Sequence, residues 1–148
     1  MPEKILNENI VQQVREVFQK LQRPVEVLFF GTENDCEYCA DTRQLMEEVV
    51  ALSDQLSLSI HDLDRDGAIA RKYRVNKAPA IVLTGMEDGQ VLDYGIRFYG
   101  IPAGHEFSAL IQGLVMVSDG DSGLEEGTRQ YLRELTQPVN LQVFSTPT

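Results

Sequence analysis

The hydrophobic and polar positions of the chain follow two different periods, and each change of period marks the boundary of an expected element. Apolar residues spaced three and four apart predict helices, whereas alternation or a short apolar run predicts a strand. Helices are expected over 7–21, from 36 to about 52, from 64 to about 75, from about 104, and from 122 to about 135. Strands are expected over 25–30, 56–60 and 77–84, on the return of a hairpin over 80–98, and at 139–143.

The order of these elements predicts an α/β fold. Two strands joined by the helix that starts at Cys36 form a βαβ unit, whose strands should be parallel with a right-handed crossover. Further on, Pro79 opens a strand at its first position, where a proline is tolerated, and Glu87–Gly89 supplies the turn of a hairpin. Helix, βαβ, helix and ββα together predict a mixed central sheet flanked by helices.

Length and charge limit the possibilities further. The chain has 148 residues, enough for one ordinary core, and a net charge of −10 without a Lys/Arg cluster argues against nucleic acid and anionic membrane as partners. The N-terminus has no apolar stretch suited to a signal peptide and no window approaches a membrane span, so we expect a cytoplasmic protein. We assign the core to residues 1–117. Beyond it, Asp119–Gly123 is a flexible link, and Ser122 with Glu125 predicts a capping box for the following helix.

The only two cysteines, Cys36 and Cys39, form a C-x-x-C at the predicted strand-to-helix junction, inside the first helical turn. Unpaired N–H groups and the helix dipole would stabilise a thiolate at Cys36, and Cys39 lies on the same face, where it can close a disulfide. The alternative is a buried or zinc-binding pair. Zinc needs two more ligands, and His61 and His105 lie in separate elements, so no metal is expected.

These motifs resemble those of the thioredoxin fold, which has a C-x-x-C after one strand and an Ala-Pro before another. More narrowly, Lys72–Pro79 and Phe98–Phe107 resemble the first unit of the glutaredoxin-like protein disulfide oxidoreductases, which carry two thioredoxin-fold units in tandem. In that family the strand that resembles Val139–Phe144 begins the second unit. The resemblance therefore implies that residues 118–148 are a linker helix and the first strand of a second, otherwise missing unit. Such a lone strand could add to the first sheet or pair with another copy in a homodimer.

The resemblance also assigns roles to individual residues. Pro79 would follow a cis bond that turns the backbone of Ala78 toward the disulfide, so that it binds an extended substrate segment; the alternative is an ordinary trans proline. Gly100 would leave room for the same segment, or would only be a turn glycine. Tyr38 would pack over the motif. We expect His105 to be structural at a helix N-terminus and His61 to be polar surface.

Two local features depart from well-known relatives. Thioredoxins carry a buried acid in the strand before the cysteines, whereas Leu28–Phe30 offers none. Classical glutaredoxins surround the motif with cations, but here Glu33, Asp35 and Glu37 precede or flank it. Because carboxylates oppose a nearby thiolate, we expect a less acidic Cys36 and a more reducing couple than in strongly oxidising relatives.

The sequence therefore predicts a thiol–disulfide oxidoreductase that reduces or exchanges protein disulfides. Cys36 would attack, Cys39 would resolve the mixed disulfide, and this redox-active disulfide would be the only cofactor. The resemblance implies electrons from a flavin-dependent reductase or a small dithiol, and protein disulfide substrates that include a peroxide-reducing partner. The alternative is a non-catalytic binding module whose turnover resides in the missing second unit.

Overall fold

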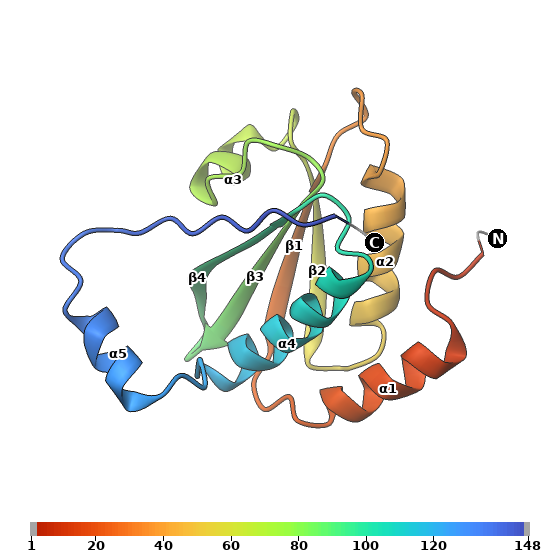
Figure 1. Ribbon diagram of the computed structural model, residues 1–148. Coiled ribbons are helices and arrows are strands. Elements are labelled where there is room, and N and C mark those ends of the chain that lie inside the picture. Colours follow the sequence, from red (N-terminus) through yellow and green to blue (C-terminus); the bar gives the residue numbers. More distant parts are fainter. Residues whose placement is uncertain (1–2, 147–148) are drawn as a thin grey trace.

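A computed structural model describes residues 3–146, which form one mixed four-stranded sheet in the order β2-β1-β3-β4 with helices around it. Figure 1 shows the strands side by side in the centre, α2 and α4 beside them, and α3 near one end of the sheet. The elements are α1 (Glu8–Phe18), β1 (Val25–Gly31), α2 (Cys39–Val50), β2 (Leu56–Asp62), α3 (Gly67–Lys72), β3 (Ala80–Glu87), β4 (Gln90–Tyr99), α4 (His105–Asp119) and α5 (Glu126–Arg133).

The sheet has the connections that the sequence predicts. β1 runs parallel to β2, with Val25 opposite Leu56, and the two strands are joined through α2. β3 runs antiparallel to both β1 and β4, and the tight turn between β3 and β4 closes the predicted hairpin. β1 lies between two neighbours and is buried except for Glu26, which explains its nearly continuous apolar run.

Alternate residues of the central strands point to two separate cores. One face packs against α1, α2 and α4, and its buried members include Val25, Val27, Met46, Leu83 and Leu114. The opposite face packs against α3 and the segment after it, and its buried members include Leu28, Phe30, Tyr73, Ala80 and Val82. The sheet is therefore covered on both sides, and its edges and ends remain for contacts with other molecules.

The start of α2 differs from the prediction. The helix begins at Cys39, so Cys36 lies in the turn before it and not within the first helical turn. Asp35 has a positive φ of 48°, which no α-helix allows, and this conformation keeps the chain out of the helix until it has passed Cys36. Asn7 caps α1, because its side chain accepts a hydrogen bond of 2.9 Å from the N–H of Ile10.

The C-terminal segment also departs from the prediction. The capping box is wrong, because Glu125 precedes α5 and Ser122 accepts its hydrogen bond from the nearby N–H of Leu124. The strand expected at 139–143 is absent within the described residues. A strand needs a partner for its N–H and C=O groups, and none of the four described strands pairs with this segment. Figure 1 shows α5 apart from the sheet and the segment after it returning toward α4, where Ser145 contacts Glu106 at 3.4 Å.

The division into residues 1–117 and 118–148 stays a prediction, and residues 1–2 and 147–148 of these ranges lie outside the described part of the chain. Within the described residues, no helix combines the length and the apolar character needed to cross a membrane.

Candidate active site

Cys36 and Cys39 are joined in a disulfide, with their Cα atoms 5.5 Å apart. The two cysteines differ in exposure: Cys36 is half-buried, whereas only 8% of Cys39 is exposed. Cys39 lies against the end of β1, since a Cβ atom added to Gly31 would stand 3.8 Å from its sulfur. A molecule approaching from solvent therefore reaches Cys36 more easily than Cys39. This asymmetry suits one attacking and one resolving thiol.

The main chain of Tyr38, which lies between the two cysteines, is held by Thr42. The carbonyl of Tyr38 accepts hydrogen bonds from the hydroxyl of Thr42 at 2.6 Å and from its N–H at 2.9 Å. Thr42 is fully buried, so these bonds fix the main chain of Tyr38 in place. Tyr38 nevertheless remains 49% exposed next to the cysteine pair, where its ring can contact a docked molecule.

The register of the sheet brings Pro79 and Gly100 to the same end as the cysteines. Ala80 lies opposite both Phe30, near the end of β1, and Tyr99, at the end of β4. The N–H of Gly100 donates a hydrogen bond of 2.9 Å to the carbonyl of Pro79. The bond between Ala78 and Pro79 is cis, as predicted, so the trans alternative is wrong.

Gly100 occupies a position that favours glycine. Its φ is +82°, and a Cβ added there would meet no other atom within 4 Å. The conformation requires glycine, and the open space is consistent with the predicted room for a substrate segment. The binding roles of Tyr38, Ala78, Pro79 and Gly100 stay predictions.

The loop before Cys36 is tied to the turn after β2, a contact that the sequence pattern does not predict. A carboxylate oxygen of Asp64 accepts hydrogen bonds from the side chains of Thr32 at 2.7 Å and Asn34 at 3.0 Å. Beside them, Arg65 pairs with Glu33 at 3.0 Å. One of the three carboxylates expected to oppose a Cys36 thiolate is therefore partly neutralised. The pattern from Asp64 predicts only a helix start, and nothing in it indicates these partners.

The same turn is held internally by Asp62. Its carboxylate accepts hydrogen bonds from the N–H groups of Arg65 at 3.0 Å and Asp64 at 2.9 Å. The bond from Arg65 is the main cause that lowers the pKa of Asp62 below its usual value. An ionised Asp62 thus keeps Asp64 in place against the loop that leads to Cys36.

The two histidines lie in different surroundings. His61 is not polar surface as expected: its side chain is 17% exposed, its ring stacks on Phe30 with centroids 5.2 Å apart, and one ring nitrogen lies 3.1 Å from the hydroxyl of Ser59. His105 is the first residue of α4 and is exposed, in agreement with the predicted position. Among residues 3–146, no three His, Cys, Asp or Glu side chains gather in a way that could hold a metal ion.

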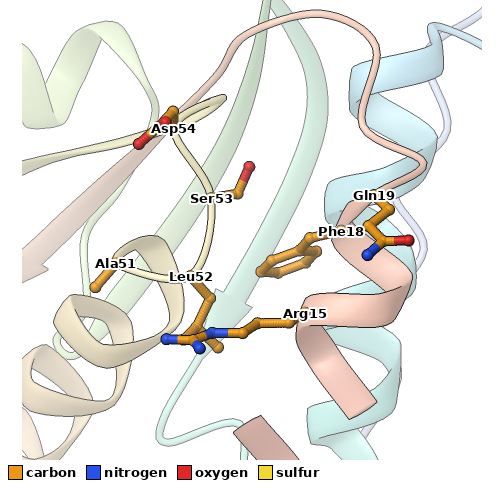
Figure 2. A pocket seen from close by; sticks show the side chains of 7 residues that line it. All are labelled: Arg15, Phe18, Gln19, Ala51, Leu52, Ser53 and Asp54. Atoms are coloured by element: carbon orange, nitrogen blue, oxygen red, sulfur yellow. The ribbon is translucent and has the colours of Figure 1, made fainter. Parts of the chain in front are cut away.

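A separate pocket of about 300 Å³ lies far from the cysteines. Figure 2 shows its lining from the end of α1 and the segment that follows α2, comprising Arg15, Phe18, Gln19, Ala51, Leu52, Ser53 and Asp54. The cysteines lie at the first turn of α2 and the pocket at its other end. A helix of 12 residues is about 18 Å long, so the pocket is outside the candidate site.

A mixed sheet of this topology, a C-x-x-C disulfide where β1 meets α2 and a cis-proline before β3 define the class of the protein. It is a thioredoxin-fold thiol–disulfide oxidoreductase.

Comparison with known proteins identifies relatives of the chain within this class. The chain is 28% identical over 142 residues to the alkyl hydroperoxide reductase component AhpF of Pseudomonas aeruginosa, covering 95% of this chain and 24% of that protein. A protein disulfide oxidoreductase from Aeropyrum pernix K1 superposes with a TM-score of 0.76 at 28% identity, covering 89% of this chain and 57% of the other. The NTD_N/C domain of alkylhydroperoxide reductase AhpF from Enterococcus faecalis superposes with a TM-score of 0.74 at 28% identity. The match covers 84% of this chain and 58% of the other.

The chain is thus a homologue of the tandem thioredoxin-fold disulfide oxidoreductases, in agreement with the resemblance inferred from its motifs. It spans about a quarter of the length of the curated relative described above. No family model matches the chain.

Proposed function

We propose that the chain is an electron relay that takes two electrons from a flavin-dependent reductase or a small dithiol and delivers them to protein disulfides. The observation that carries this proposal is the unequal exposure of the two sulfur-bearing residues at one end of the sheet, with Cys36 accessible and Cys39 8% exposed. The similarity to the alkyl hydroperoxide reductase component AhpF supports a peroxide-reducing protein among the disulfide substrates.

The reaction proceeds by two exchanges. In the reduced chain, the Cys36 thiolate attacks one sulfur of the substrate disulfide, and the other substrate sulfur leaves as a thiolate that takes up a proton. Cys39, deprotonated, then attacks the Cys36 sulfur and displaces the second substrate sulfur. The substrate gains two electrons and two protons, and the chain is left with the Cys36–Cys39 disulfide. A reductant returns both cysteines to the dithiol.

The residues around the pair would hold the substrate. The register brings the Ala78–Pro79 backbone and Gly100 to the cysteine end of the sheet. We assign to this backbone the binding of an extended segment by strand-like hydrogen bonds, with Gly100 leaving room for it and Tyr38 contacting its side chains.

A redox titration in dithiothreitol buffers, read by thiol trapping and mass shift, tests the proposal. We expect a reversible two-electron transition near −270 mV, roughly the potential of thioredoxins. A transition between about −120 and −180 mV would contradict the reducing direction. No transition would favour the non-catalytic binding module.

Turnover separates the roles of the cysteines. Wild-type chain with dithiothreitol should reduce a disulfide-bonded protein such as insulin, and Cys36→Ser should abolish this activity. Cys39→Ser should instead accumulate a mixed disulfide that mass spectrometry detects on Cys36, because the resolving thiol is gone. A mixed disulfide on Cys39 in the Cys36→Ser variant would overturn the assignment of roles.

We also propose that the exposed C-terminal segment pairs with a second copy of the chain. Val139, Leu141 and Val143 alternate along it and are 61%, 88% and 92% exposed. An apolar segment of this kind, outside the described sheet, is suited to strand addition. Light scattering should show a dimer that Leu141→Asp disrupts, whereas the exposed polar change Asn140→Asp should leave it intact. A monomeric wild-type chain at high concentration would refute the idea.

We further propose a cytoplasmic location. The support is the cysteine usage: both cysteines belong to one C-x-x-C, as in proteins of reducing compartments, where structural disulfides are rare.

A further inference from the structure

Asp93 and Arg97 form an ion pair within β4. Two parallel hydrogen bonds join them, from Nη1 to Oδ1 at 2.8 Å and from Nη2 to Oδ2 at 2.7 Å. The side chains are 33% and 16% exposed, so water competes little for this two-pronged contact. The bonds from Arg97 are the main cause that lowers the pKa of Asp93 below its usual value.

An irregularity in β4 brings the two side chains together. Arg97 lies opposite Val82 and Asp93 opposite Thr84, so three residues of β4 separate positions that a single residue separates in β3. In a regular strand, residues four apart are about 13 Å apart, too far for a bidentate pair. Gly95 has a φ of +84° and donates its N–H to Asp93 at 2.9 Å, and this turn of the backbone forms the bulge.

Arg97 also reaches a different element, while Nη1 donates a further bond of 3.1 Å to the carbonyl of Ile96 within β4. Its Nε and Nη2 atoms donate to the carbonyl of Tyr73 at 3.1 and 2.9 Å. Tyr73 caps the end of α3, and five residues separate it from Pro79. The far end of this segment is held as well, because Gly100 donates to the carbonyl of Pro79. Both ends of segment 73–79 are thus fastened to β4 or to the residue after it.

We infer that Arg97, aligned by Asp93, is a positioning residue that fixes segment 73–79 so that the Ala78–Pro79 backbone is ordered before a substrate arrives. The inference rests on the proposed function and adds to it the group that prepares the binding backbone. A segment that is already ordered loses less conformational freedom on binding, so the substrate binds more tightly. The hydrogen-bond partners of Arg97 are Tyr73, Asp93 and Ile96, so we assign it no direct role in the exchange reaction.

The test compares Arg97→Met, which keeps the aliphatic stem and removes all donors, with Arg23→Met. Arg23 is a matched control, because it also hydrogen-bonds the end of a helix. It donates to the carbonyls of Ser118 at 3.1 Å and Asp119 at 2.6 Å. It also pairs with an acid, Glu87, at 3.6 Å. It lies just before β1, at the end of the sheet opposite the cysteines. Arg97→Lys is a second variant, which keeps the positive charge but lacks the planar guanidinium that forms the two-pronged contact with Asp93.

Two readouts decide the matter in the full chain. Hydrogen exchange at the amides of Arg74 and Val75 should accelerate by about tenfold or more in Arg97→Met and not in Arg23→Met. The KM for a disulfide-bonded peptide should rise by about tenfold in Arg97→Met, with kcat within about twofold of wild type and Arg97→Lys in between. Alkylation of the reduced cysteines should be unchanged.

An unchanged KM, an unchanged exchange rate, or equal effects in both arginine variants would overturn the inference. Failure of the proposed function is distinguishable, because it appears as absent peptide turnover in the wild-type chain. In that case the substrate role of Arg97 falls with it, while the exchange data still decide whether Arg97 holds the segment.

Discussion

Gly31 ends β1 directly behind the cysteine pair, and replacing it with alanine is a sharp test of how tightly this region is packed. A Cβ atom at position 31 would stand 2.8 Å from Cε1 and 3.0 Å from Cζ of Phe29, and 3.8 Å from the sulfur of Cys39. Carbon atoms do not approach that closely, so the ring of Phe29 has to move. Phe29 is only 3% exposed and has little room to do so.

The size of the effect follows from two opposing contributions. Overpacking of a buried site costs about 1–3 kcal/mol. Alanine restricts the unfolded chain more than glycine does, which returns about 0.4–1 kcal/mol where the backbone conformation allows it. The middle of the first range is about 2 kcal/mol and that of the second about 0.7 kcal/mol, so we expect Gly31→Ala to lower the free energy of unfolding by about 1.3 kcal/mol.

Urea unfolding of the oxidised chain, followed by circular dichroism, measures this difference. Gly127→Ala is the control, because Gly127 lies in α5 and a Cβ there meets no atom within 4 Å. That variant should be at least as stable as wild type, since alanine favours a helix over glycine. A Gly31→Ala chain as stable as wild type would refute the close packing of Phe29 against the end of β1.

Three further predictions concern the site. The alkylation rate of reduced Cys36 should rise with pH, Glu37→Gln should move that rise to lower pH, and a thiol already ionised at about pH 5 would contradict the argument from the acidic flank. Because the pKa of Asp93 is lowered in the folded chain, its stabilising effect is present above the unfolded value of about 4 and is lost as the pH falls through the folded value. Asp93→Asn should therefore flatten the acid side of the stability curve measured by urea unfolding, and an unaltered curve would contradict a stabilising contact between ionised Asp93 and Arg97. Gly100→Val should lose about 1–2 kcal/mol of stability in the same assay, because valine is strained at a φ of +82°, and a fully stable variant would speak against that conformation.

The sequence predicts the sheet and the cysteine pair well, for physical reasons that are local. β1 and the hairpin are specified by apolar runs and a turn, and the cap at Asn7 by a single side chain next to its helix. The predicted start of α2 at Cys36 is too early, because hydrophobic spacing does not show a left-handed residue such as Asp35. Helical periodicity shows that a helix is present more reliably than it shows at which residue the helix begins.

The groups that hold the site in place escape prediction because their partners are distant in the sequence. Asp64 reaches back to Thr32, and Arg97 reaches to Tyr73, across intervals that no local pattern spans. One signal is present in the sequence: a glycine between an acid and an arginine within a strand indicates a bulge that pairs them. The strand at 139–143 is predicted from alternation alone, which describes a strand's faces but cannot supply its neighbour.

The position of Cys36 ahead of α2 has a mechanical consequence. Its backbone takes no part in the ladder of the helix, and Cys39 is the first helical residue. When the sulfurs separate, pair with a foreign sulfur and join again, we expect the rearrangement to be confined to the three-residue turn of Cys36–Tyr38, ahead of the helix. The packed layers beneath this turn would then keep their shape through the proposed cycle.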